Sequence, residues 1–172
     1  MTGRLIVLRG NSGSGKSTVA AELRRRLGDG IAVVEQDYLQ RHVLGARETN
    51  TGENSELIEL VTRYALANAQ AVVLEGILSA ELYSDLLSRL ASGGGVQSSF
   101  YYFDLPFEET VARHQTREKA GSFGEVELRR WFAERDLLAF TPERLIGATS
   151  SAQDTAARIL DEAGLRPGRL LR

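Results

Sequence analysis

The feature that most constrains this chain is an apolar run that stops in a glycine-rich loop and resumes as a helical pattern. The segment in question reads LIVLRGNSGSGKSTVAAEL and begins at Leu5. Its run at residues 5–9 is typical of a buried strand. Residues 16–27 then place Val19 and Leu23 on one face of a helix. The sequence therefore predicts a strand, a tight loop and a helix that follow directly on one another.

The loop between these two elements matches a phosphate-binding pattern. GNSGSGKS at residues 10–17 fits G-x-x-x-x-G-K-[ST] at every fixed position. Its glycines let backbone N–H groups converge on phosphate oxygens without Cβ clashes, and the helix that follows adds its positive N-terminus. An ordinary glycine-rich turn is the alternative, but the flanking strand and helix supply the context that the motif requires.

The same loop predicts the ligands ATP and Mg²⁺. Lys16 can reach the β- and γ-phosphates, and the hydroxyl of Ser17 can ligate Mg²⁺. We therefore expect the whole loop to contact the nucleotide. The expected ATP-binding residues in this loop are Gly10, Asn11, Ser12, Gly13, Ser14, Gly15, Lys16, Ser17 and Thr18.

Strand and helix patterns alternate along the rest of the chain. Four further strands are expected, at residues 31–35, 71–75, 98–105 and 144–148. A glycine-containing break at residues 120–125 divides two helices, and the second is expected to run to about Leu138. Five strands alternating with helices predict an α/β fold of three layers, with a parallel sheet, helices on both faces and a single domain over residues 1–172.

Composition excludes several classes of site. The chain has no cysteine, which excludes disulfides and thiolate chemistry, and its two histidines are too few for an imidazole-rich metal cluster. A net charge of −2 gives no general attraction to nucleic acid or to an anionic membrane. No apolar run approaches the roughly 18 residues of a membrane span, and the N-terminus enters a strand pattern without a signal peptide. We therefore expect a cytoplasmic protein.

Acidic residues follow the ends of three predicted strands. Ligands of parallel sheets bind beyond the carboxyl ends of the strands, so these side chains could share one crevice. Glu75 is placed to hold Mg²⁺ together with Ser17, although a solvated strand end is the alternative. Asp37 could accept a proton from a substrate hydroxyl that attacks the γ-phosphate, or it could cap the short helix that follows. Asp104 resembles a structural cap for the helix that begins at Pro106.

Arginines cluster on the two helices around the glycine-containing break. Arg113 and Arg117 are four residues apart and therefore share a helical face. The next helix carries Arg129, Arg130 and Arg135. Residues 113–137 could form a lid that closes arginines over the transferring phosphoryl group. The alternative is a pair of solvated helix faces whose arginines pair with neighbouring glutamates.

Polar residues directly after Asp37 are candidates for binding the phosphate acceptor. They are Tyr38, Arg41 and His42. An imidazole at this position could orient a hydroxyl or a phosphate. A polar surface helix is an equally good interpretation of the same residues.

The layout of these motifs resembles the P-loop kinases of the nucleoside-monophosphate-kinase type. The shared parts are GNSGSGKST after the first strand, an Asp after the second, VVLEG on the third, and FDLPFEETVARHQTR leading into a lid. VVLEGIL is also similar to uridine kinases. QDYLQR resembles the Asp-bearing segment of polynucleotide 5′-kinases, zeta toxins and chloramphenicol phosphotransferases. The resemblance extends over most of the chain.

This resemblance implies the strand order 2-3-1-4-5 and a helical lid. The R-x-x-x-R spacing is similar to that of adenylate and shikimate kinases, which implies that Arg113 stacks on adenine and that Arg117 contacts phosphates. The loop at residues 148–153 would pass beside the adenine. The chain departs from the pattern because it has no clear monophosphate-binding helix and no lid cysteines. It also lacks an N-K-x-D motif, which speaks against a GTPase.

Together these features predict a Mg²⁺-ATP-dependent kinase that transfers the γ-phosphate to a hydroxyl of a small metabolite, nucleoside, sugar or antibiotic. Lys16, Asp37 and Arg117 are the expected catalytic residues. A nucleotide-binding switch is one alternative, but a switch needs no base for an acceptor hydroxyl. A polynucleotide 5′-hydroxyl kinase is another, disfavoured by the acidic balance and the lack of a basic tract. The sequence leaves open the acceptor, the choice between ATP and other nucleoside triphosphates, and the oligomeric state.

Overall fold

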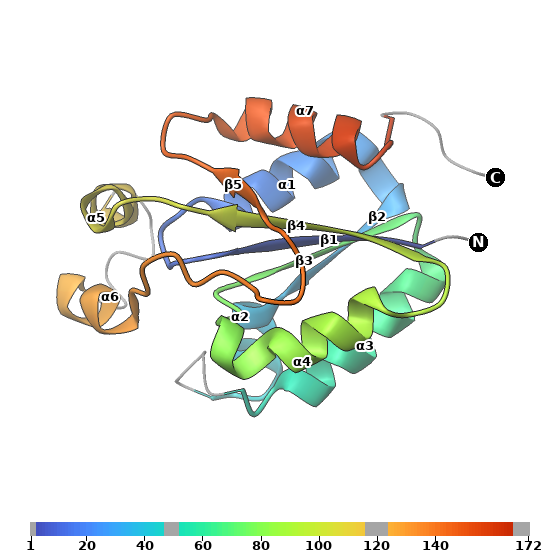
Figure 1. Cartoon of the computed structure of the whole chain (residues 1–172), viewed down its shortest axis with the longest axis horizontal. Coiled ribbons are helices and arrows are strands. Elements are labelled where there is room, and N and C mark those ends of the chain that lie inside the picture. Colours follow the sequence, from blue (N-terminus) through green and yellow to red (C-terminus); the bar gives the residue numbers. More distant parts are fainter. Residues whose placement is uncertain (1–2, 47–51, 116–123, 167–172) are drawn as a thin grey trace.

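A computed structural model of the chain describes residues 3–46, 52–115 and 124–166. Within these ranges, the strands form one parallel sheet with the order β2-β3-β1-β4-β5 (Figure 1). The strands are β1 (Gly3–Gly10), β2 (Ile31–Glu35), β3 (Ala71–Gly76), β4 (Val96–Phe103) and β5 (Arg144–Ile146). The predicted parallel sheet and its strand order are therefore confirmed.

Helices cover both faces of this sheet, as Figure 1 shows. One face carries α1 (Lys16–Leu27) and α7 (Ala152–Glu162), and the opposite face carries α3 (Ser55–Asn68) and α4 (Ala80–Ala91). Beyond the carboxyl end of β4 lie α5 (Phe107–Gln115) and α6 (Glu125–Trp131). A 3-10 turn, η1 (Gly28–Gly30), follows α1, and β2 leads into α2 (Gln36–Tyr38) and a π-helical turn, η2 (Leu39–Val43). The three-layer fold is thus confirmed.

The sheet separates two hydrophobic cores because alternate residues of a strand point to opposite faces. In β1, Ile6 and Leu8 pack with the α1 and α7 side, whereas Leu5 and Val7 pack with the α3 and α4 side. All four are fully buried. A strand that is buried on both faces explains why the sequence shows a continuous apolar run there and no alternation.

Strand register brings the functional motifs to one edge of the sheet. Glu75 of β3 lies between two neighbouring strands. It is paired with Glu35 at the end of β2 on one side and with Leu8 of β1 on the other. Gly10, the last residue of β1, is paired with Phe103 of β4. The phosphate loop, the residues after β2 and the end of β3 therefore meet beyond the carboxyl ends of neighbouring strands.

The helix after the glycine-containing break is shorter than expected. It ends at Trp131 and not near Leu138, because the backbone becomes extended at Phe132 and enters the left-handed region at Arg135, with φ of 47°. Residues 132–143 form an irregular segment that returns to β5, and we call it the return segment. The expected lid at 113–137 falls partly outside the described residues, which omit 116–123. Among the residues that are described, no helix combines the length and apolarity that a membrane crossing requires.

Candidate active site

The phosphate loop adopts a backbone that only glycine accommodates at two points. Gly10 has φ of 137°, and a Cβ there would lie 2.9 Å from the carbonyl oxygen of Phe103. Gly13 has φ of 80°, and its Cβ would lie 2.6 Å from the carbonyl oxygen of Thr110 in α5. The loop is therefore packed against β4 and α5 with no room for side chains at these glycines.

Lys16 lies inside this loop. Its side chain is buried, and its Nζ donates hydrogen bonds of 2.8 Å to the carbonyl oxygens of Gly10 and Asn11 and of 3.2 Å to Ser14 Oγ. These acceptors hold the ammonium at the centre of the loop, where the phosphates of a nucleotide would approach. The loop thus presents a positive charge together with the N-terminus of α1, an arrangement suited to an anion.

Ser17 and Glu75 form the polar pair next to the loop. Ser17 Oγ donates a hydrogen bond of 2.8 Å to Glu75 Oε1, and Glu75 is buried at the end of β3. Burial raises the pKa of the Glu75 carboxyl, while the charge of Lys16 and the Ser17 hydrogen bond oppose that shift. The carboxylates of Glu35 and Asp37 raise the same pKa further, so negative charge accumulates at this point.

This pair fits a hard divalent cation. A hydroxyl and a carboxylate are oxygen ligands of the kind that Mg²⁺ prefers. Over the described ranges, no group of three or more His, Cys, Asp or Glu side chains is arranged to hold a metal by itself. Ser17 and Glu75 could therefore supply two protein ligands to an ion that takes its remaining ligands from water and phosphate oxygens, the usual Mg²⁺ arrangement.

Asp37 lies in α2, two residues beyond the end of β2. Its Oδ1 accepts a hydrogen bond of 2.6 Å from Arg41 Nε, and both side chains are partly exposed. The preceding residue, Gln36, is buried and anchors this turn: its Nε2 donates to Tyr83 Oη at 2.9 Å, and its Oε1 accepts from the backbone N–H of Leu78 at 3.2 Å. Asp37 is therefore carried by a turn that is fixed to α4 and to the segment after β3.

The other expected acceptor-binding residues form an exposed surface beside Asp37. The rings of Tyr38 and His42 stack with their centroids 4.9 Å apart. Tyr38 is 56% exposed, and Val43 and Leu44 are about as open to solvent. The structure thus brings Asp37, Tyr38, Arg41 and His42 together on one helical turn, with an aromatic face turned outward.

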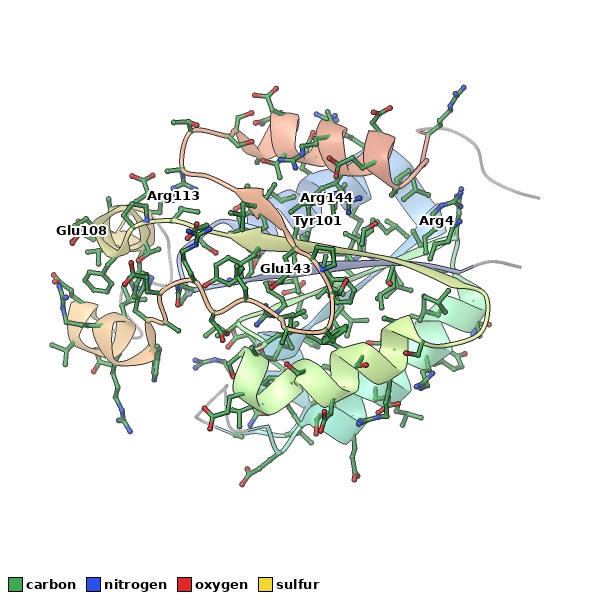
Figure 2. All side chains as sticks on the ribbon, viewed as in Figure 1. Arg4, Tyr101, Glu108, Arg113, Glu143 and Arg144 are labelled. Carbon is green, nitrogen blue, oxygen red and sulfur yellow. The ribbon has the colours of Figure 1, made fainter. Side chains whose placement is uncertain are left out.

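Arg113 connects the phosphate loop to the segment after β5. Its guanidinium donates to the carbonyl oxygens of Ser14 at 3.2 Å and Ala148 at 2.7 Å, and its Nε pairs with Glu109 Oε1 at 2.7 Å. Figure 2 shows Arg113 on α5, turned toward the loop that leads into α7. Beside it lies a cavity of about 300 Å³. Its lining includes Gly15, Thr18, Arg113, Gly147 and Ser150.

The other arginines that were expected to belong to the lid have different surroundings. Arg117 lies outside the described residues. Arg129 places its guanidinium 4.0 Å from the ring centroid of Phe107, and Arg130 is exposed. Arg135 pairs with Asp104 Oδ2 at 3.5 Å, so the strand-end acid that resembled a cap lies opposite a cation from the return segment. Among the described residues, the partners of Arg129 and Arg135 lie in α5, in α6 and just after β4, and not in the phosphate loop.

Sequence reasoning missed a buried arginine directly before the loop. Arg9 is fully buried in β1 and donates to the carbonyl oxygen of Leu78 at 2.8 Å. It also pairs with Asp136 at 3.1 Å and with Glu143 at 2.8 Å, both in the return segment. The available signal was an arginine at the end of an otherwise apolar strand, because a buried guanidinium requires acidic partners from elsewhere in the chain.

The matching family model covers most of this architecture. A model described as AAA domain, AAA_33, matches residues 5–140. The chain belongs to this family. The matched range includes the phosphate loop, Asp37, Glu75 and Arg113. No curated protein sequence matches the chain.

Solved structures with the same fold are P-loop kinases and related proteins. APS kinase of Mycobacterium tuberculosis, in complex with AMPPNP and APS, has a TM-score of 0.70 and 22% identity over 93% of this chain and 96% of its own. A gluconokinase of Sinorhizobium meliloti has a TM-score of 0.60 and 19% identity, with 92% and 90% covered. The tunicamycin resistance protein of Deinococcus radiodurans has a TM-score of 0.67 and 18% identity, with 98% and 99% covered. The resemblance to P-loop kinases of the nucleoside-monophosphate-kinase type is therefore confirmed for the fold.

Proposed function

We propose that this protein is a Mg²⁺-ATP-dependent kinase that transfers the γ-phosphate to a hydroxyl group of a small molecule. The observation that carries the proposal is the Ser17–Glu75 pair, which joins the phosphate loop to the edge where Asp37 lies. Three groups with the chemistry for phosphate binding, cation binding and proton acceptance thus follow the carboxyl ends of neighbouring strands, which supports the proposal. The family model and the kinases that share the fold support the same reaction type.

The chain's own residues divide the work of phosphate transfer. The loop amides and Lys16 bind the β- and γ-phosphates and stabilise the charge that spreads over the oxygens during transfer. Ser17 and Glu75 hold Mg²⁺, which would neutralise these phosphates when bound. The nucleoside of ATP occupies the cavity beside Arg113, between α5 and the segment after β5.

Asp37 acts on the acceptor. Its carboxylate accepts the proton of the attacking hydroxyl as the new O–P bond forms and the bond to the β-phosphate oxygen breaks, leaving ADP. Arg41 orients the carboxylate through its 2.6 Å hydrogen bond. The acceptor packs beside Tyr38 and His42, whose exposed stacked rings suit a molecule with an apolar or ring-shaped face.

The domain assignment and the lid belong to this proposal as well. One domain spans residues 1–172, and residues 113–137 form a lid over the site. Arg117, which lies outside the described residues, would supply a guanidinium to the transferring phosphoryl group. Arg113 stays at the nucleotide, an assignment that its contacts to Ser14 and Ala148 support.

The test is a screen of ATP consumption against nucleosides, sugars and antibiotics, followed by variants of the base. Asp37→Asn should leave ATP affinity near that of the parent and lower phosphate transfer at least about 10²-fold, the usual scale for a general base. Asp85→Asn, on the exposed side of α4, is the matched control and should leave transfer unchanged.

The two other functions give different results in the same screen. A nucleotide switch would hydrolyse ATP at one rate whatever hydroxyl compound is added, and Asp37→Asn would leave that rate unchanged. A polynucleotide kinase would label only the 5′ ends of oligonucleotides. If the thermal stability of Asp37→Asn falls in step with its activity, Asp37 is a helix cap and the base assignment is wrong.

A further inference from the structure

The side chain of Asn11 in the phosphate loop bonds to the protein backbone in both directions. Its Nδ2 donates to the carbonyl oxygen of Ala133 at 2.8 Å, and its Oδ1 accepts from the N–H of Ala133 at 2.9 Å. Asn11 itself is 6% exposed, whereas Ala133 lies at the surface, so the two bonds are partly buried. This amide therefore joins the loop to a residue 122 positions later, at the start of the return segment.

Two neighbouring strand residues fix the same segment. Tyr102 Oη in β4 donates to the carbonyl oxygen of Ala133 at 3.4 Å and accepts from the N–H of Asp136 at 3.1 Å. Arg9 bonds the carbonyl oxygen of Asp136 at 3.0 Å and also pairs with Glu143. The return segment is thus held at its beginning, middle and end by the residues that surround Gly10.

The part of the segment between these anchors forms the wall of a cavity that reaches the phosphate loop at Asn11. Arg135 lies between Ala133 and Asp136 and has a left-handed backbone, a strained state that persists only where the surroundings impose it. A cavity of about 480 Å³ separates this wall from the end of β4 and the start of α5. Its lining includes Asn11, Asp104, Phe132, Glu134 and Arg135. Asn11 is the phosphate-loop residue among these.

Asn11 also contacts the lysine of the loop. Its carbonyl oxygen accepts a hydrogen bond of 2.8 Å from Lys16 Nζ. Asn11 therefore bonds to Lys16 through its own backbone and to the return segment through its own side chain.

We propose that Asn11 is a positioning residue that holds the return segment against the phosphate loop, so that water is kept from the γ-phosphate during transfer. It acts through Ala133 and does not contact the reacting atoms. The inference rests on the proposed kinase function. When the amide is removed, the return segment keeps its bonds to Arg9 and Tyr102 but loses its two bonds to Asn11. The wall then moves away from the loop, water reaches the phosphate, and ATP is hydrolysed without transfer to the acceptor.

The experiment compares Asn11→Ala with the parent in three measurements. Amide hydrogen exchange at residues 132–136 should become faster in the variant, because Ala133 N–H loses its acceptor. The affinity for a non-hydrolysable ATP analogue should change by less than about 3-fold. The ratio of ATP hydrolysed to acceptor phosphorylated should rise about 10-fold, the scale expected when a wall moves by a fraction of an ångström.

Two further variants separate positioning from stability. Asn11→Asp keeps the acceptor for Ala133 N–H but places a carboxylate oxygen against the Ala133 carbonyl, so it should behave like Asn11→Ala and not rescue the ratio. Ile159→Val, a core change in α7 on the opposite face of the sheet from Leu138 of the return segment, should lower the thermal midpoint and leave the ratio unchanged.

Each outcome decides the inference. Unchanged exchange at residues 132–136 would show that the Asn11 amide does not hold the return segment, and it overturns the proposal. Faster exchange with an unchanged ratio shows that the bonds are only structural and overturns the positioning role. If the parent phosphorylates no acceptor, the kinase proposal fails. The rate of ATP hydrolysis alone then tests the role of Asn11. A rate that rises about 10-fold in Asn11→Ala supports this role, and an unchanged rate overturns it.

Discussion

At the scale of single residues, Lys16 has the clearest expected effect. Its ammonium is held inside the loop by two carbonyl oxygens and a hydroxyl, ready for an anionic ligand. We expect Lys16→Ala to weaken ATP binding at least about 10-fold and to abolish turnover, because the loop at residues 10–17 carries no second cationic side chain. Calorimetry with ATP measures the first effect. Equal affinity in the variant and the parent, with the fold intact by circular dichroism, would contradict the assignment.

Glu75 gives a prediction about pH. Burial raises the pKa of its carboxyl above the ordinary value of 4.5, so in this region the folded state binds more protons than the unfolded state. Stability contributed by this group is therefore greatest at low pH and is lost as pH rises from about 4.5 through the folded pKa. Without Mg²⁺, Glu75→Gln should raise the thermal midpoint at pH 8 by a few degrees and by less at pH 5.

A second measurement on the same variant separates electrostatics from packing. Mg²⁺ with ATP should stabilise the parent more than Glu75→Gln, because the neutral amide is a poorer ligand for the cation. Equal thermal shifts for the two proteins on addition of Mg²⁺-ATP would remove Glu75 from the metal site. A gain in thermal midpoint that is the same at pH 5 and at pH 8 would show that the substitution acts only through the shape of the side chain.

At the scale of elements, the junction between β3 and α2 supports Asp37. A Cβ on Gly76 would lie 2.3 Å from Gln36 Oε1 and 2.6 Å from Gln36 Cβ, so the turn that carries Asp37 would have to move. We expect Gly76→Ala to lower phosphate transfer by about 10-fold or more while ATP binding changes little. Gly94→Ala is the matched control, since nothing lies within 4 Å of its Cβ. Equal transfer rates in the two variants would show that Gln36 does not position Asp37.

Local sequence patterns were sufficient for the elements and for the phosphate loop. The apolar run of β1 and the periodicity of α1 are properties of neighbouring residues, and the parallel sheet follows from their alternation. The strand order came from the family resemblance and agrees with the structure. The roles assigned to Asp37, Glu75 and Arg113 remain predictions.

Local sequence patterns could not predict where α6 ends or which residues Arg9 and Asn11 contact. The charged pattern after Trp131 by itself predicts a helix up to about Leu138. Tertiary bonds to Ala133 and Asp136 override it and pull the backbone into an extended segment. Partners more than a hundred positions apart leave no periodic signal in a single sequence, so their pairing could not be read from it.

At the scale of the whole molecule, Arg9 holds distant parts of the chain together. Its guanidinium is fully buried between two carboxylates, and Glu143 is nearly as buried. Removing one member of such a group leaves an unpaired charge in the core, so Arg9→Met should reduce the free energy of unfolding by about 3–5 kcal/mol. Urea denaturation measures the loss. Arg25→Met, which breaks an exposed pair with Glu22, should leave the denaturation midpoint unchanged.

The position of β1 in the sheet has a consequence for the chain as it leaves the ribosome. The central strand, β1, is synthesised before the other strands of this sheet, and its neighbours β3 and β4 come some 60 and 90 residues later. The carboxylates that pair with Arg9 follow 127 and 134 positions after it. A nascent chain that stops before residue 136 would have to bury this guanidinium without them, so we expect it to stay unfolded and open to proteases. Nucleotide binding therefore begins only after the return segment has been synthesised, and pulse proteolysis of chains ending at residue 130 or 166 measures that order.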